Sequence, residues 1–305
     1  SYEATLESRI ILGRPLEYDS DPAAWVSYRC SQQSRGYTDD SVAPEDRWTS
    51  QVVSTAFGSV GQSVPEAAIS GDTVAVASTF RSSDGSQTAH LNVYDAQTGE
   101  ERFEKDIGSG ESRGCLIAGP YVVGVSEDGD VEAYDKYSGD LYASTSTSYS
   151  FDGQPQHDDG TIYVPEDGGT VLGYDIFDDL SEVYQSGVVG SPARSPAIGD
   201  GRLYTVDANG GTLAAYSLDD GSEEWTGSVP ADVTWSPAYF DGYVLVQSED
   251  AGGDSGDVSQ VTALDATDGT QLWKITNEYT DLSAYEGVNT PVPALARAPG
   301  FVDDA

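Results

Sequence analysis

Basic residues and sulfur-containing residues are scarce in this sequence. Its 305 residues include no methionine, two cysteines, two histidines and 14 lysines and arginines together, against 52 aspartates and glutamates, so the net charge is -38. The few basic side chains are spread along the chain and form no cationic patch. Because proteins bind nucleic acid largely by neutralising its phosphates with Lys and Arg, the composition excludes nucleic acid from the expected partners.

Long hydrophobic runs are also absent. No stretch of about 18 apolar residues occurs, so the sequence predicts no membrane-spanning helix. Residues 1–20 have neither the basic start nor the apolar centre of a signal peptide. Whether an initiator methionine or an export signal preceded Ser1 stays open at this stage.

The shortage of cysteine and histidine limits the possible catalytic and metal sites. Cys30 and Cys115 are too few for a disulfide framework or a cysteine metal site, and they are either two buried thiols or one bridge. His90 and His157 belong to no ligand cluster and have no serine partner in a nucleophile motif. We therefore assign no catalytic, cofactor-binding or metal-ligating residue from the sequence.

Negative charge, in contrast, is abundant along the whole chain. Repulsion between so many carboxylates opposes a compact fold in dilute buffer, whereas in molar salt the Debye length falls to about 3 Å. Five tryptophans, 19 tyrosines and regular apolar patterning argue against a disordered acidic chain. The composition resembles that of proteins from extreme halophiles, haloarchaea above all, or from their viruses.

A repeated unit organises the sequence from about residue 60 onward. Each copy has a short apolar run, an acidic turn that usually contains glycine, and an aromatic residue after the turn. The five copies are 91–103, 131–142, 171–184, 213–225 and 261–273. Aligned on the apolar residue before the turn, the copies recur every 40 to 48 residues, which is typical of a propeller or a solenoid.

The repeated residues have structural explanations. The aspartate after the apolar anchor is expected to accept turn N–H groups, glycine allows a positive φ, and the closing aromatic is expected to be buried between units. The closing aromatics are Phe103, Tyr142, Tyr184, Trp225 and Trp273. The other assigned repeat residues are Tyr94, Asp95, Gly99, Tyr134, Asp135, Gly139, Tyr174, Asp175, Tyr216, Gly221, Leu264, Asp265 and Gly269.

Each unit also contains two upstream strands, and no helical periodicity of useful length occurs. The sequence therefore predicts an all-β fold, a β-propeller of four-stranded antiparallel blades. We expect six blades, with strands from both ends of the chain closing the ring; the alternative is a ring of seven or eight blades of which part is missing. The expected divisions are an N-terminal extension at 1–48 and a propeller at 49–305, with units at about 49–107, 108–145, 146–188, 189–229, 230–276 and 277–305 plus N-terminal strands.

The repeat resembles that of the PQQ-like (pyrroloquinoline-quinone-type) propellers. Residues 261–273, VTALDATDGTQLW, match the repeat almost throughout, residues 91–103 match it well and residues 171–184 match it poorly. The N-terminal AAWVSYRCSQQSRGY followed by RWTSQ resembles the entry segment of haloarchaeal members. The resemblance covers roughly residues 25–300.

The resemblance has implications for function as well as fold. The dehydrogenase members of this class hold a quinone and Ca²⁺, use a catalytic aspartate and often carry adjacent cysteines. Here Cys30 and Cys115 are far apart, and no motif matches those ligands or that aspartate. We therefore expect no cofactor and no enzymatic activity, with a PQQ-dependent oxidoreductase as the only enzyme class suggested.

A partner-binding surface is expected on the irregular connections of one face. The connections 79–89 and 249–258 look enlarged, and the segment 274–288 is expected to join them. The candidate surface residues are Trp235, Asp250, Asp254, Asp257, Tyr279 and Tyr285. Solvated loops of a halophilic protein are the alternative interpretation.

Three functions follow in order of preference. The first is a non-catalytic propeller that serves as a protein-interaction or scaffold module in high salt. The second is a structural or surface component of a haloarchaeal virion, and the third is a quinoprotein dehydrogenase. The expected partners are other proteins, and for a virion component they belong to a larger assembly. We expect the protein at the cell surface, outside the cell or in a virion rather than in the cytoplasm.

Overall fold

The computed structural model describes residues 66–82, 84–190, 195–207, 209–230, 233, 236–250 and 258–278. Every regular element in these ranges is a β-strand, so the all-β prediction is confirmed for them. No helix in these ranges has the length and apolar character that crossing a membrane requires. The predicted N-terminal extension at 1–48 and the predicted closing strands lie outside the described residues.

In the described ranges, twenty strands form five four-stranded antiparallel sheets, numbered here I to V, and strand order within each sheet follows the sequence. Sheet I contains β1 (Glu66–Ser70), β2 (Thr73–Arg81), β3 (Gln87–Asp95) and β4 (Glu101–Ser109). Sheet II contains β5 (Ser112–Ala118), β6 (Tyr121–Ser126), β7 (Asp130–Asp135) and β8 (Leu141–Ser146). Sheet III contains β9 (Gln156–Asp158), β10 (Thr161–Pro165), β11 (Val171–Asp175) and β12 (Ser181–Gln185).

The last two sheets repeat the pattern. Sheet IV contains β13 (Ala197–Gly199), β14 (Arg202–Asp207), β15 (Thr212–Ser217) and β16 (Glu223–Ser228). Sheet V contains β17 (Ala238–Phe240), β18 (Tyr243–Asp250), β19 (Val258–Asp265) and β20 (Gln271–Glu278). The repeat that the sequence predicts is thus one four-stranded antiparallel sheet per copy.

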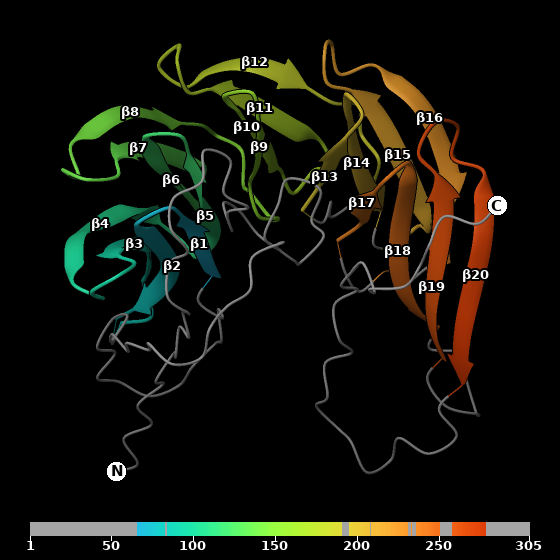
Figure 1. Cartoon of the computed structure of the whole chain (residues 1–305), viewed down its shortest axis with the longest axis horizontal. Helices are drawn as coiled ribbons and strands as arrows, with labels where there is room; N and C mark the ends of the chain where they lie inside the picture. The colour runs from blue at the N-terminus through green and yellow to red at the C-terminus, as the bar shows by residue number, and fades with distance from the viewer. Residues whose placement is uncertain are drawn as a thin grey trace.

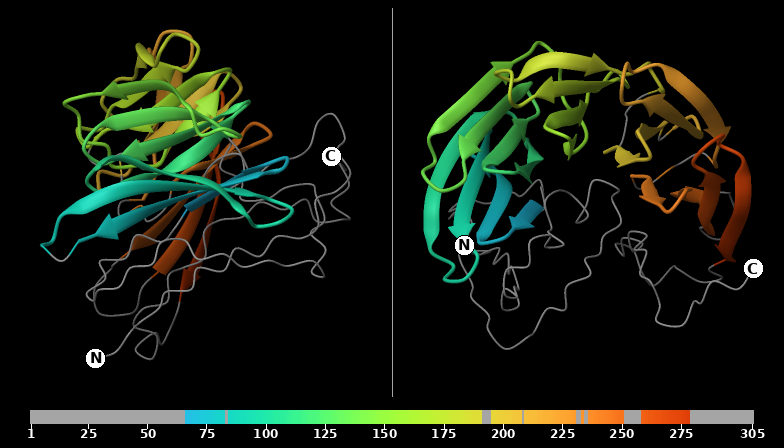
Figure 2. Two further views of the ribbon diagram at one scale, coloured as in Figure 1. Left: turned by 90° about the vertical axis from the view of Figure 1, so that its left-hand side faces the viewer. Right: turned by 45° about the horizontal axis from the view of Figure 1, so that its top comes forward.

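The five sheets follow one another in an arc, with the first strand of each sheet inside and the fourth strand outside (Figure 1; Figure 2). The first strands of adjacent sheets contact one another, as in β1 with β5, β5 with β9 and β9 with β13. This is the radial arrangement of propeller blades. The described sheets form an open arc rather than a closed ring (Figure 2), so the number of blades and the closure stay predictions.

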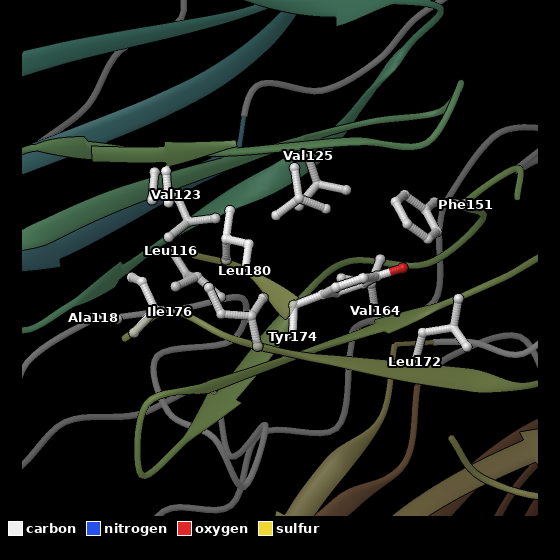
Figure 3. Close-up of a cluster of buried hydrophobic side chains, with 14 residues drawn as sticks. Leu116, Ala118, Val123, Val125, Phe151, Val164, Leu172, Tyr174, Ile176 and Leu180 are labelled. Atoms are coloured by element: carbon white, nitrogen blue, oxygen red, sulfur yellow. The ribbon is translucent and has the colours of Figure 1, made fainter. Parts of the chain in front are cut away.

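The core lies between the sheets, because the middle strands are apolar on both faces. β6 and β14 are buried along most of their lengths. Figure 3 shows the cluster between sheets II and III, in which Leu116 and Val123 of sheet II meet Tyr174 and Leu180 of sheet III. Small residues suit the inner strands, where the sheets converge: Ala197 and Gly199, for example, are both buried in β13.

One irregularity recurs in all five sheets. The pairing of the third and fourth strands shifts by one residue directly after their turn, which is a β-bulge. The extra residue on the fourth strand is called the bulge residue below. The five bulge residues are Arg102, Tyr142, Val183, Glu224 and Leu272.

The structure corrects two expectations at this level. The connection 79–89 is not an enlarged loop, because β2 continues to Arg81 and β3 starts at Gln87, with a tight turn between them. Tyr142 is not a closing aromatic, since it is the bulge residue of β8 and Ala143 takes the position that Phe103 has in sheet I. Ala143 is buried there, and Tyr142 is 43% exposed.

Candidate interaction surface

Two turns of each sheet are joined at one end of the sheet, called the turn end below. They are the turn between the first and second strands and the turn between the third and fourth strands. In every sheet, the second residue after the apolar anchor donates its backbone N–H to a carbonyl oxygen of the turn between the first and second strands. The five donors and acceptors are Ala96 to Asp72, Lys136 to Pro120, Ile176 to Gly160, Leu218 to Gly201 and Ala266 to Gly242.

The repeated aspartate organises the turn between the third and fourth strands. Asp95 Oδ1 accepts the backbone N–H groups of Gln97 and Thr98, each at 2.9 Å. Asp135 accepts two turn N–H groups in the same way. In sheet IV the exception, Ser217, accepts the N–H of Asp219 with its hydroxyl at 3.1 Å. These side chains stabilise turns, which is the local role that short polar residues have in such positions.

Glycine completes the same turn, because the backbone there has a positive φ. Gly99, Gly139, Gly221 and Gly269 have φ values between 71° and 72°. Sheet III lacks this glycine and holds Asp179 and Leu180 at φ values of 55° and 53° instead. Leucine rarely adopts that conformation, whereas aspartate tolerates it, so the copy that matches the repeat poorly also has the most unusual turn.

Hydrogen bonds at the turn end make several carboxyl groups more acidic. The Arg102 guanidinium, together with the turn N–H groups, lowers the pKa of Asp95 to about 2. Hydrogen bonds from Thr267 lower the pKa of Asp265, and those from Ser222 lower the pKa of Asp220. Hydrogen bonds donated to a carboxylate favour its ionised form. These carboxyl groups of the turn end therefore keep their negative charge down to acidic pH.

Aromatic residues of the fourth strands pack on the turn end of the following sheet. The Trp225 indole N–H donates to the carbonyl of Ala266 at 3.0 Å, and its ring lies against Gly269. Phe103 lies against Gly139 in the same relation. Trp273, the equivalent residue of sheet V, is 41% exposed. The residues that would follow sheet V lie outside the described part of the chain, so the burial of Trp273 stays a prediction.

The bulge residues differ in chemistry, and so do the contacts that they make. The place where one sheet packs on the next is called a junction below. In sheet I, Arg102 donates to Asp95 at 2.8 Å and to the Thr73 hydroxyl at 2.9 Å, and its guanidinium carbon lies 5.0 Å from the Tyr137 ring centre. In sheet IV, Glu224 forms an ion pair with Arg202. Arg102 thus reaches across to Tyr137 of sheet II, whereas the ion pair of Glu224 lies within sheet IV.

The junction of sheets II and III is aromatic instead. The bulge residue Tyr142 stacks on Tyr121 with ring centres 4.0 Å apart and planes at 25°. Phe177, in the turn between β11 and β12, meets Tyr121 edge-on at 6.5 Å. Hydrogen bonding to Tyr142, followed by desolvation, raises the pKa of the Tyr121 hydroxyl. Tyr142 and Phe177 are 43% and 65% exposed, so the sheets leave a large apolar surface uncovered here.

Most of the predicted surface residues lie outside the described part of the chain. This applies to Trp235, Asp254, Asp257, Tyr279 and Tyr285, while Asp250 ends β18. Reasoning from the sequence missed the aromatic junction because Tyr142 was assigned to the buried series. The available signal was Ala143, whose small side chain fits the buried position next to Tyr142.

The cysteine prediction remains untested. Cys115 is buried on β5, in the cluster between sheets I and II. Its predicted partner Cys30 lies outside the described residues.

The expected absence of a quinone and Ca²⁺ stays a prediction, and only metal-ligating clusters can be checked in the described residues. Within the described ranges, no group of three or more His, Cys, Asp and Glu side chains is placed to hold a metal ion. His157 sits on the inner strand β9, where burial lowers its pKa and a hydrogen bond links it to the backbone of Ile117. Its Nε2 atom is buried and has no partner among the described groups. Such a histidine links neighbouring sheets rather than supplying a ligand set.

The comparisons with known proteins identify the family. The family model described as "Outer membrane protein assembly factor BamB" matches residues 87–195 and 178–297, which is more than half of the chain. The chain belongs to this family. Its members carry the PQQ-type repeat, so the resemblance noted from residues 261–273 is confirmed. No curated protein sequence matches the chain.

Solved structures show the same fold at low sequence identity. BamB from Moraxella catarrhalis is 19% identical with a TM-score of 0.52, over 67% of this chain and 61% of that one. The computationally designed protein Ika8 is 16% identical with a TM-score of 0.54, over 68% and 60%. Sqt1 from Saccharomyces cerevisiae is 11% identical with a TM-score of 0.53, over 67% and 58%. The chain thus spans about three fifths of the length of these structures, and the likeness shows the fold alone.

Proposed function

We propose that this BamB-family chain is a non-catalytic β-propeller that acts as a protein-interaction or scaffold module in a high-salt environment. The observation that carries the proposal is the aromatic junction, where Tyr142 and Phe177 are exposed on a turn end fixed by backbone hydrogen bonds. Exposed apolar side chains gathered on a rigid surface mark sites of protein contact. The family description, an assembly factor, supports the same function.

The proposal includes a ring that is completed by both ends of the chain. Val74, Val76 and Tyr94 of sheet I form an apolar cluster on the face turned away from sheet II. At the other end of the arc, sheet V exposes 41% of Trp273. The equivalent residue of sheet IV, Trp225, is covered by the sheet that follows it. Both faces have the apolar character of an inter-blade contact. They support a sixth blade built from residues 279–305 and N-terminal strands.

The charge supports the proposed environment and location. With 52 acidic and 14 basic residues, the chain gains compactness when salt screens its carboxylates. We place the protein outside the cytoplasm, at the cell surface or beyond it, in a halophilic setting. The proposal assigns no quinone and no Ca²⁺ to the protein.

Affinity purification tests this function. The tagged chain is isolated from its native source in molar KCl, and reproducibly enriched proteins are identified by mass spectrometry. The proposal expects one or more stoichiometric protein partners. In parallel, the purified chain is supplied with PQQ and Ca²⁺ and assayed for dye-linked oxidation of alcohols and sugars. Turnover in that assay would replace the scaffold function with a dehydrogenase.

A further inference from the structure

We propose that the aromatic junction binds a cationic side chain of a basic protein partner. The binding surface, called the aromatic ledge below, consists of Tyr121, Tyr142 and Phe177. The inference rests on the proposed function, since it names the class of partner and the place where it binds. Three observations carry it: the fixed exposed rings, the cation that occupies the equivalent position in the preceding junction, and the surrounding charge.

The rings of the ledge are held in place although they are exposed. Tyr121 begins β6 and packs on the buried cluster between sheets II and III. Tyr142 is stacked on it, and Phe177 contacts it edge-on. The Phe177 ring also lies directly over Gly160, where a Cβ atom would overlap it. A surface that is already ordered loses little conformational freedom when a partner binds.

The junction of sheets I and II shows what this position holds when the chain supplies a cation itself. Arg102 is the bulge residue there, as Tyr142 is in sheet II. Tyr137 is the third residue after the anchor, as Phe177 is in sheet III. The Arg102 guanidinium carbon lies 5.0 Å from the Tyr137 ring centre, and Lys136 Nζ lies 5.3 Å from it.

At the ledge, the corresponding cation is missing from the described part of the chain. No described Lys or Arg lies over the ring of Tyr121, Tyr142 or Phe177. The π-face of an aromatic ring attracts ammonium and guanidinium groups. Both junctions therefore place an aromatic ring at the same turn position. Among the described residues, only the ring in the first junction has a cation of the chain over it.

Carboxylates around the ledge add electrostatic attraction for a cation. Asp140 precedes β8, Asp178 and Asp179 follow Phe177, and Asp159 lies beside Gly160. All four are exposed, and none of them is ion-paired with a described basic residue. Complementary charge of this kind steers a basic partner to the surface and favours it over neutral ones.

The charge also decides which molecule binds there. A second copy of the chain would bring another 38 negative charges to a surface that is already acidic. The segments 1–65 and 279–305 each contain more acidic than basic residues, so the chain's own ends are poor counterparts. The occupant that fits is a separate protein with an exposed Arg- or Lys-rich segment.

Binding of a defined peptide tests the inference. The probe is a fluorescent 12-residue peptide of alternating Arg and Gly, and the matched control peptide carries citrulline, which is neutral, in place of Arg. Affinity for the full chain is measured by fluorescence anisotropy in 0.15 M and in 2 M KCl. We expect binding of the Arg peptide at both salt concentrations and at least tenfold weaker binding of the citrulline peptide, because a cation–π contact remains when salt screens the carboxylates.

Variants locate the binding on the ledge. Tyr142→Arg recreates the arrangement of the preceding junction, so its own guanidinium should occupy Phe177 and weaken peptide binding about tenfold. Phe177→Ser should weaken binding to a similar extent. Val188→Ser is the control and should leave binding unchanged, because Val188 is 68% exposed and is not part of the ledge. Circular dichroism and unfolding in KCl verify that each variant folds.

The outcomes separate this inference from the proposed function. Equal binding of the citrulline peptide, or retention of wild-type affinity by folded Tyr142→Arg and Phe177→Ser, would overturn the inference. If those variants also still retain the native partners in affinity purification, the scaffold function stands and only the ledge is excluded as its site. If the wild-type chain captures no partner but the ledge binds the Arg peptide as expected, the scaffold function fails and the chemistry of the ledge stands.

Discussion

Trp225 of sheet IV donates its indole N–H to the carbonyl oxygen of Ala266 in sheet V, at 3.0 Å. The side chain is only 8% exposed, and its ring covers Gly269 in the turn of the next sheet. One tryptophan thus satisfies a turn carbonyl and fills the space between two sheets. The closing aromatic of the repeat is therefore a contact between repeats, and its environment depends on the sheet that follows.

Replacement of the two equivalent tryptophans tests whether a sixth blade covers sheet V, in which case their effects should be similar. Trp225→Ala should lower the free energy of unfolding by about 3–5 kcal/mol, because it leaves a cavity between sheets and removes the shorter of two hydrogen bonds to the Ala266 carbonyl. Trp273 is 41% exposed beside the described sheets, so Trp273→Ala should cost a similar amount only if the proposed sixth blade covers its ring. Denaturant unfolding at one fixed KCl concentration gives both values. A loss at Trp273 well below half of the loss at Trp225 would contradict the proposed sixth blade.

Two turn glycines with the same backbone conformation should also respond differently to alanine. Gly201 and Gly269 both have φ of 72°, but a Cβ at Gly201 meets nothing within 4 Å, whereas at Gly269 it would overlap the Trp225 ring. Gly201→Ala should therefore cost about 1–2 kcal/mol from backbone strain alone. Gly269→Ala should cost about 1–3 kcal/mol more from overpacking. If thermal or denaturant unfolding ranks the two variants the other way, the proposed packing of Trp225 on that turn is wrong.

Acid sensitivity should depend on the ion pair between Arg102 and Asp95. The pKa of Asp95 is lowered to about 2 from the usual 3.8. A depressed carboxyl pKa stabilises the folded state fully above the unfolded value, and this contribution is lost as the pH falls from about 4 to about 2. Arg102→Gln should raise the Asp95 pKa toward 3.8 and remove part of that pH dependence.

Carbon-detected NMR titration of the aspartates measures this change directly. Asp265 is the internal control, because its pKa is lowered by Thr267 and not by an arginine. An Asp95 pKa that stays near 2 in Arg102→Gln would show that the turn N–H groups, rather than the guanidinium, keep the carboxylate ionised.

Stability should rise with salt concentration over an unusually wide range. The net charge of -38 repels itself at low ionic strength, and the Debye length falls from about 10 Å at 0.1 M to about 3 Å at 1 M. The melting temperature should therefore drop steeply below roughly 0.5 M KCl, where screening of the carboxylates weakens. Sucrose at matched osmolality serves as the control for effects unrelated to charge. A melting temperature that is constant from 0.1 to 2 M KCl would contradict the assignment to a high-salt environment.

Much of the architecture follows from the sequence because the repeat constrains it locally. The apolar anchor, the turn aspartate and the turn glycine recur at fixed positions, and each has a backbone requirement that the structure displays, as at Asp95 and Gly99. Sheet III is the weakest match in sequence, and it is also the sheet in which Asp179 takes the conformation that glycine has elsewhere. Local turn chemistry is readable from residue types alone.

The aromatic ledge could not be predicted in the same way. Its formation depends on the bulge after the turn, which places Tyr142 one position away from the buried series and beside Tyr121. A β-bulge has no fixed residue type here, since its five occupants are Arg, Tyr, Val, Glu and Leu. Contacts such as Tyr121 with Phe177 also join different repeats, and periodicity within one repeat does not report them.

The size of the native particle tests the central claim, that this propeller works by holding other proteins, most directly. The protein is extracted from its native source in molar KCl without cross-linking, and its mass is measured by size-exclusion chromatography with light scattering. The account predicts a complex of defined mass that is larger than one chain and contains at least one different protein. A homogeneous particle with the mass of a single chain would contradict it.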